Sequence, residues 1–149
     1  MANCYRMIQM TNNAIPAVAA NALLPLGTVT RRVCPRSCGC QTFELSYTGA
    51  DTVTINEAGY YRVAYTLSGA AGAAGVAEIS LLAGGNTLYS VSATAAAEGD
   101  EVQIPLMFMV RAFRNSDSLP ANLPLAVQIK NAGVALTSAV GNLLIEKAY

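Results

Sequence analysis

Short strand-like segments, separated by turn residues, follow one another from residue 26 to the end of the chain. In TFELSY (42–47), Phe43, Leu45 and Tyr47 alternate with other residues, which is the period of a strand with one buried face. Turns such as GGN (84–86) and EGDE (98–101) stand between segments. The expected strands are 26–33, 42–47, 52–55, 60–69, 76–83, 87–95, 102–113, 125–131 and 142–149, the last preceded by 133–141. No segment predicts a crossover helix, so the pattern favours an all-β, two-sheet antiparallel jelly-roll sandwich over a parallel α/β sheet.

Three of these segments are apolar on both faces. YYRVAYTL (60–67), IPLMFMV (104–110) and NLLIEK (142–147) do not alternate cleanly, whereas an antiparallel strand with one wet face should. Pro105 within the second segment marks a bulge or an unpaired edge position. One face would pack in the sandwich, and another copy of the chain is the simplest cover for the other. A thick single-chain core is the alternative.

The charge content also predicts a partner. The chain has 149 residues, about one domain, and only 12% of them are charged, compared with roughly 25% in ordinary domains. Its net charge is zero and its basic residues are scattered, which argues against binding to nucleic acid. No stretch reaches the roughly 18 consecutive apolar residues of a membrane helix. We therefore expect no nucleic-acid or membrane partner, but an oligomer or a packed particle.

Residues that carry enzyme chemistry are scarce. The chain has no histidine, which excludes Ser-His-Asp and Cys-His nucleophiles and His-based zinc hydrolases. The acidic groups Glu98/Asp100/Glu101 and Asp51/Glu57 lie at turns, where charges are usually solvated. Calcium binding by Asp51, Glu98 and Asp100 is a weaker alternative, because no dense Asp-x-Asp run is present. GAAGAAG (69–75) lacks the lysine of a phosphate-binding loop. We expect no catalytic residues, no cofactor and no enzyme activity.

The amino-terminal region is predicted to be an arm, residues 1–25, ahead of a jelly-roll domain at 26–149. Within it, AVAANALL (17–24) is compatible with a short helix. The apolar stretch 14–27 is interrupted by two prolines and lacks an adjoining basic segment, so it does not predict a signal peptide. Synthesis in a bacterial cytoplasm is therefore expected.

Three of the four cysteines lie in CPRSCGC, a loop at 34–40. A zinc site of Cys4, Cys34, Cys38 and Cys40 is poorly matched, because zinc knuckles usually have Cys-x2-Cys spacing. A disulfide between Cys38 and Cys40 would close a strained ring. A bond from Cys4 to one of the other three would fix the arm to the first strand. Disulfides within a chain, disulfides between chains and free thiols all remain open.

The block TVTINEAGYYRVAYTLSG (52–69) resembles the signature of the tumour-necrosis-factor-like and complement-type globular-head jelly rolls. In that signature, a turn ending in glycine precedes an aromatic-rich strand, as Gly59, Tyr60 and Tyr61 do here. AAAEGDEVQI (95–104) and NLLIEKAY (142–149) are similar to the bacterial branch, the carboxy-terminal domains of BclA-type glycoproteins and their stalkless relatives in Firmicutes and phages. The resemblance covers residues 42–149, and the chain lacks the collagen-like stalk of BclA.

This resemblance implies a homotrimer. In the family, the sheet made by the first, third, sixth and last strands packs around the threefold axis, and the segments that are apolar on both faces here are the third, sixth and last. The residues expected at the trimer interface are Tyr60, Arg62, Tyr65, Met107, Met109, Leu143 and Ile145.

These observations predict a non-enzymatic structural protein on the surface of a particle. The preferred hypothesis is a trimeric phage capsid decoration protein at the virion surface, attached to capsid or other particle proteins through its arm. A receptor- or glycan-binding head, using the loops 69–75 and 114–124, is a second hypothesis. A spore-surface or fibre subunit cross-linked through arm cysteines is a third.

Overall fold

The structure is a computed structural model, and it describes residues 6–33, 45–115 and 120–148. The regular structure in these ranges consists of strands. Their bounds are β1 Met7–Ile15, β2 Thr28–Val33, β3 Leu45–Thr48, β4 Thr52–Ile55, β5 Gly59–Ala71, β6 Gly75–Ala83, β7 Asn86–Ala95, β8 Glu101–Ala112, β9 Leu125–Asn131 and β10 Leu136–Lys147.

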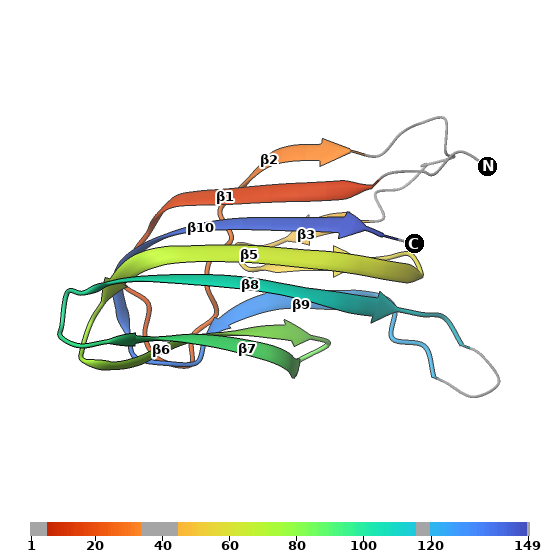
Figure 1. The fold of residues 1–149 in the computed structure, drawn as a ribbon. Coiled ribbons are helices and arrows are strands. Elements are labelled where there is room, and N and C mark those ends of the chain that lie inside the picture. The colour runs from red at the N-terminus through yellow and green to blue at the C-terminus, as the bar shows by residue number, and fades with distance from the viewer. Residues whose placement is uncertain (1–5, 34–44, 116–119, 149) are drawn as a thin grey trace.

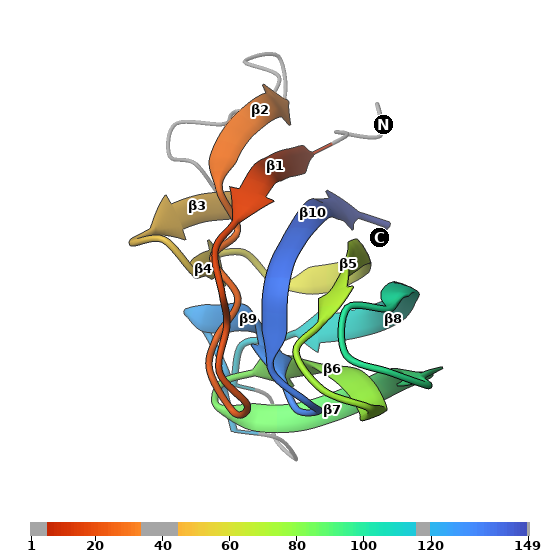
Figure 2. The same ribbon diagram turned by 90° about the vertical axis from the view of Figure 1, so that its left-hand side faces the viewer.

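The strands form two five-stranded sheets that pack as two layers (Figures 1 and 2). Sheet A has the order β2-β1-β10-β5-β8, and sheet B has the order β3-β4-β9-β6-β7. Every pairing within the sheets is antiparallel. The predicted two-sheet antiparallel sandwich is confirmed. The three segments that are apolar on both faces, now β5, β8 and β10, lie side by side in sheet A, as expected.

Pro105 lies in the middle of an edge strand. β8 pairs only with β5, and its register runs without a shift from Gly59↔Ala112 to Ala70↔Glu101. Proline has no N–H to donate to a ladder, so it is tolerated where one side of the strand is unpaired. The edge position, and not the bulge, is therefore the correct one of the two predicted explanations.

The segment expected to be an arm differs from the prediction. Met7–Ile15 is strand β1, inserted between β2 and β10 with Ile8 opposite Ile145. The MIQMT sequence explains why, because Ile8 and Met10 point into the core while Gln9 and Thr11 alternate with them.

The helix considered for 17–24 is also absent, since this described segment forms isolated bridges at Val18 and Leu23 with a turn at Ala20 and Asn21 between them. Val18 N–H donates to Leu136 C=O at 2.8 Å, and Leu24 N–H donates to Ile129 C=O at 2.8 Å. The segment therefore crosses from sheet A to β9 of sheet B before the chain returns as β2 (Figure 2). Pro16 and Pro25, on either side, disfavour helix at the residues that precede them.

The core lies between the two sheets. Alternate residues of every long strand point inward, so the period of two in the sequence becomes one apolar layer. Each buried leucine or isoleucine contributes about 1.5–3 kcal/mol relative to an exposed one. The largest fully buried side chains are Tyr61, Tyr65, Ile8, Met10, Ile15, Leu24, Leu26, Ile55, Leu67, Ile79, Leu81 and Ile104.

Tyr65 carries a buried hydroxyl into this core. Its side chain is 1% exposed, and no residue in the described ranges is hydrogen-bonded to its oxygen. Gly141 leaves the space for the phenol, because a Cβ there would lie 2.2 Å from the Tyr65 oxygen. Because Gly141 has no side chain, the Tyr65 side chain of the neighbouring strand is able to pack beneath β10.

Burial raises the pKa of the Tyr65 phenol above its ordinary value of 10.0. The folded protein then holds this proton more tightly than the unfolded chain, so the contribution of Tyr65 to stability is intact below about pH 10 and falls as the pH rises further. We expect urea denaturation of Tyr65→Phe to show a free energy of unfolding that declines less steeply above about pH 10. Tyr47→Phe, at an exposed tyrosine, is the control. Identical slopes for wild type and Tyr65→Phe would contradict the assignment.

Candidate assembly surface

The outer face of sheet A is the side turned away from sheet B, and Figure 1 views it directly. Its centre is built by the register of β10, β5 and β8. Ala64 lies between Leu144 and Met107, and Arg62 lies between Glu146 and Met109. The central outward-facing residues are Tyr60, Arg62, Ala64, Thr66, Ser68, Gln103, Pro105, Met107, Met109, Arg111, Val140, Asn142, Leu144 and Glu146.

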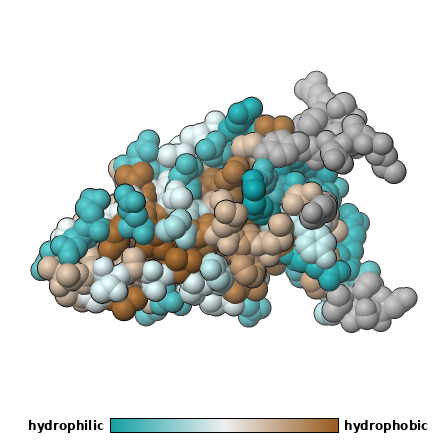
Figure 3. Space-filling view, in the orientation of Figure 1, coloured by the Kyte–Doolittle hydropathy of each residue, from teal (hydrophilic) through white to brown (hydrophobic). Residues whose placement is uncertain are grey.

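Apolar side chains gather in the middle of this face, and Figure 3 shows them between more hydrophilic margins. Met107 is 63% exposed, the highest value among the exposed large hydrophobic residues that the structure describes. Met109, Val140 and Tyr60 are also exposed. A contiguous exposed apolar patch usually marks a contact surface, whereas scattered single residues do not.

The outer face of sheet B provides an internal comparison. It is mainly hydroxyl, amide and charged, and Ser80 and Ser90 share a hydrogen bond of 2.7 Å across it. Val76 and Leu88 are exposed apolar residues of this sheet. Its polar outward-facing residues are Thr52, Thr54, Glu78, Ser80, Ser90, Ser92, Gln128 and Lys130. The two sheets of one molecule thus differ in the way expected if sheet A is covered and sheet B faces water.

Charged side chains at one end of the apolar band are paired or stacked on an aromatic ring. Arg62 forms an ion pair with Glu146 across β5 and β10. The Arg111 guanidinium lies over the Tyr60 ring, 5.8 Å from its centroid. Paired or ring-stacked charges lose less on burial than isolated ones, so this end of the face is also able to enter an interface.

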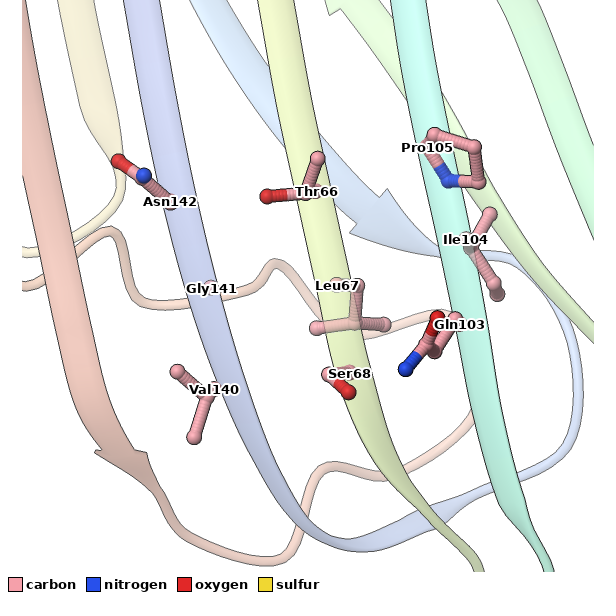
Figure 4. A pocket seen from close by; sticks show the side chains of 9 residues that line it. All are labelled: Thr66, Leu67, Ser68, Gln103, Ile104, Pro105, Val140, Gly141 and Asn142. Carbon is pink, nitrogen blue, oxygen red and sulfur yellow. The ribbon is translucent and has the colours of Figure 1, made fainter.

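The other end of the face is hollowed. A depression of about 260 Å³ lies over β5, β8 and β10, and residues of all three strands line it (Figure 4). Its lining is Thr66, Leu67, Ser68, Gln103, Ile104, Pro105, Val140, Gly141 and Asn142. The side chains of Ser68 and Thr66 are short, which lowers the surface there. None of these lining residues titrates near neutral pH, so they offer no general acid or base.

Four of the seven predicted interface residues lie on this face, and three do not. Tyr60, Arg62, Met107 and Met109 face outward. Tyr65, Leu143 and Ile145 are buried in the sandwich core, so their assignment to a surface was wrong. Leu143 pairs with Tyr65, so these residues share the inward phase.

Val140 and Leu144 are the outward-facing apolar residues of β10 that the prediction missed. Three apolar residues in a row, Leu143 to Ile145, hide the phase of this strand in the sequence. The flanking polar residues Asn142 and Glu146 are the signal that indicates it, because even-numbered residues here face outward.

The acidic turn residues have local structural roles. Asp100 Oδ2 accepts hydrogen bonds from the N–H groups of Ala96 and Ala97, each at 3.0 Å. Asp51 accepts one from the Thr52 hydroxyl at 2.9 Å. Glu57 forms ion pairs with Arg6 and Lys147. Within the described ranges, no three His, Cys, Asp or Glu residues are grouped to hold a metal ion.

The cysteine predictions concern residues that the structure does not describe. Cys4, Cys34, Cys38 and Cys40 lie in ranges 1–5 and 34–44, so their pairing stays a prediction. In the part of the chain that the structure describes, no helix has the length and apolar character needed to cross a membrane.

The fold is that of tumour-necrosis-factor-like and complement-type globular heads. The globular domain of zebrafish complement 1qA protein matches with a TM-score of 0.64, covering 97% of this chain and 98% of that one at 9% identity. Eiger TNF from S. frugiperda matches with a TM-score of 0.65, 11% identity and coverage of 95% and 92%. The predicted TNF-like jelly roll is confirmed.

A viral protein has the same fold. The PRD1 vertex protein P5 matches with a TM-score of 0.60 at 16% identity, and the match covers 99% of this chain and 100% of that one. No protein-family model matches the sequence, and no curated protein matches it. Likeness at these identities defines the fold, and the narrower BclA-like relationship stays a prediction.

Proposed function

We propose that this chain is a non-enzymatic structural protein that forms a homotrimer through the outer face of sheet A and decorates the surface of a particle, namely a phage virion. The observation that carries the proposal is the contrast between the exposed apolar outer face of sheet A and the polar outer face of sheet B. Such a contrast within one sandwich supports burial of sheet A in an assembly.

The hollow, together with the projecting residues Met107 and Met109, supports a heterologous contact, in which two different surfaces of neighbouring copies meet. Met107 and Met109 stand out from β8 at one side of the sheet, while the hollow over Ser68 and Val140 lies further along the strands. Different surfaces that meet head to tail close into rings when the rotation allows it. A ring of three copies is the expectation given by the resemblance of the sequence to trimeric heads.

The particle surface is supported by the likeness to a virion vertex protein over the full length of both chains. The proposed attachment to other particle proteins cannot use residues 7–15 as a free arm, because they form β1 within sheet A. Attachment through the remaining amino-terminal residues stays part of the proposal.

The test introduces charge into the centre of the apolar band. We expect wild type to sediment as a trimer and Met107→Lys to sediment as a folded monomer, with the trimer population reduced at least about tenfold at micromolar concentration. An unpaired ammonium buried in an interface costs several kcal/mol, which exceeds the 1.4 kcal/mol of a tenfold change.

Val76→Lys is the matched control, because it adds the same charge at an exposed apolar residue of the opposite sheet. It should remain trimeric, and circular dichroism should show both variants folded. A monomeric wild type, or a trimeric Met107→Lys, would reject the proposed interface. Electron microscopy of purified particles labelled for this chain would then test the location.

A further inference from the structure

The methionines of this chain fall into two groups with opposite exposure. Met7 and Met10, on β1, are buried in the core at 7% and 0% exposure. Met107 and Met109, on β8, are 63% and 45% exposed. Met1 lies outside the described residues. An oxidant has to reach a thioether before it reacts, so the two methionines of β8 should be oxidised first.

The place of Met107 and Met109 in sheet A leaves their side chains uncovered on two sides. They are two residues apart in one strand, so both point to the outer face of the sheet. β8 is an edge strand, so no further strand of sheet A lies beyond them. On the other side, Met107 is opposite Ala64, whose side chain is a single methyl group. A molecule as small as a peroxide therefore has access to both side chains in the free subunit.

Oxidation of methionine by a peroxide is a balanced two-electron step. The sulfur lone pair attacks one peroxide oxygen, so that an S–O bond forms and the O–O bond breaks. The second oxygen leaves as hydroxide and takes the proton of the transferred oxygen, which reduces hydrogen peroxide to water. No side chain of the protein has to give or accept a proton. The product, methionine sulfoxide, is polar and chiral, whereas methionine is apolar and flexible.

A sulfoxide at these positions would change what the outer face of sheet A is able to bury. The S–O group is a hydrogen-bond acceptor, and the residues across the sheet from Met107 are Ala64 and Leu144, whose side chains have no donor. Burial of an acceptor without a donor is unfavourable. In the free subunit, water hydrates the sulfoxide at no such cost. Oxidation should therefore weaken assembly and leave the fold of the subunit intact.

We propose that Met107 and Met109 form an oxidation site, at which a peroxide converts both residues to sulfoxides in the free subunit and thereby prevents assembly. The inference rests on the proposed trimer, in which the outer face of sheet A is covered. Copies that are already assembled bury these side chains and are protected, so the site distinguishes free subunits from assembled ones. Enzymes that reduce methionine sulfoxide would reverse the change.

The test oxidises the chain at low concentration, where free subunits predominate, with hydrogen peroxide as the probe. Peptide mass spectrometry should show Met107 and Met109 oxidised at least about tenfold faster than the buried Met7 and Met10. After the peroxide is removed and the chain is concentrated, sedimentation should show a trimer population at least about tenfold below that of the untreated chain. Treatment with the two methionine sulfoxide reductases, one for each epimer, should restore the trimer.

M107L/M109L is the matched control, because leucine keeps the apolar character and nearly the volume of methionine but forms no sulfoxide. The variant retains all four cysteines, which peroxide also oxidises. It should form the trimer with and without peroxide treatment. Loss of its trimer on oxidation alone would assign the effect to the cysteines and overturn the inference. Rescue by the reductases makes the same distinction in the wild-type chain, because these enzymes act on methionine sulfoxide.

The outcomes separate this inference from the proposed function. A wild-type trimer that persists after both residues are oxidised overturns the inference and leaves the proposed trimer standing. A wild-type chain that is monomeric before oxidation rejects the proposed trimer, and the inference fails with it. Equal oxidation rates for the exposed and the buried methionines also overturn the inference. So does oxidation of Met109 at the same rate in the wild-type trimer and in monomeric Met107→Lys, because assembly would then not protect the site.

Discussion

Gly141→Ala is expected to lower the free energy of unfolding by about 3 kcal/mol, the upper part of the range for overpacked cores. The added Cβ would lie 2.2 Å from the Tyr65 hydroxyl oxygen, 2.9 Å from its ring carbon Cζ and 3.2 Å from a methyl carbon of Ile15. Both neighbours are buried, Tyr65 at 1% exposure and Ile15 at 2%, so neither has free space to move into. The cost arises from displacement of packed side chains and not from an unusual glycine backbone.

The double variant Tyr65→Phe/Gly141→Ala separates this explanation from a general intolerance of β10 to substitution. Removing the hydroxyl eliminates the closest contact, so part of the loss, about 1–2 kcal/mol, should be recovered. Tyr65→Phe alone should be neutral or slightly stabilising, because it removes a buried oxygen that no described residue hydrogen-bonds. Urea denaturation of all four proteins gives the coupling energy. Strict additivity of the two substitutions would refute the contact.

The order of the strands illustrates what the sequence can and cannot predict. The alternation in β5 and the turns at GGN and EGDE predicted strands and a two-sheet fold, because local periodicity and turn chemistry decide these features. The segments that are apolar on both faces also predicted which strands share sheet A. The phase of β10 was not predictable, because Leu143, Leu144 and Ile145 are equally apolar and only the register with β5 assigns them to opposite faces.

The insertion of β1 beside β10 was missed for a different reason. Met7–Ile15 pairs with the last strand, and contacts between the two ends of a chain leave no mark on local sequence patterns. Composition was misleading here, since the neighbouring alanines and prolines suggested an arm. The sequence therefore predicted the correct sheet for the candidate surface, but only some of the residues that form that surface.

Glu57 gives the second large prediction, because one carboxylate oxygen joins both ends of the described chain. Glu57 Oε2 accepts a hydrogen bond from Arg6 and another from the Lys147 ammonium at 2.9 Å. Lys147 N–H also donates to the Arg6 C=O at 2.8 Å, and the Tyr61 hydroxyl donates to the Glu57 C=O at 2.9 Å. The side chains of Arg6 and Lys147 are 9% and 16% exposed, so water only partly compensates for a lost anion.

Glu57→Ala is expected to lower the free energy of unfolding by about 2–3 kcal/mol, because it leaves two poorly hydrated cations close together without their shared carboxylate. The value lies below the 3–5 kcal/mol of fully buried pairs, since Glu57 itself is 29% exposed. Removing one donor should cost less than removing the acceptor, because Arg6 still pairs with Glu57. Lys147→Met should therefore lower the free energy of unfolding by only about 1 kcal/mol.

The control for Glu57→Ala is Glu98→Ala, an exposed turn carboxylate, which should change stability by less than about 0.5 kcal/mol. The double variant Glu57→Ala/Lys147→Met should be more stable than Glu57→Ala alone, since it removes one of the two repelling cations. Thermal and urea denaturation of the set measures these differences. Equal losses for Glu57→Ala and Lys147→Met would show that the pair of Arg6 and Glu57 adds nothing to stability, and therefore that the carboxylate does not hold the two ends of the chain together.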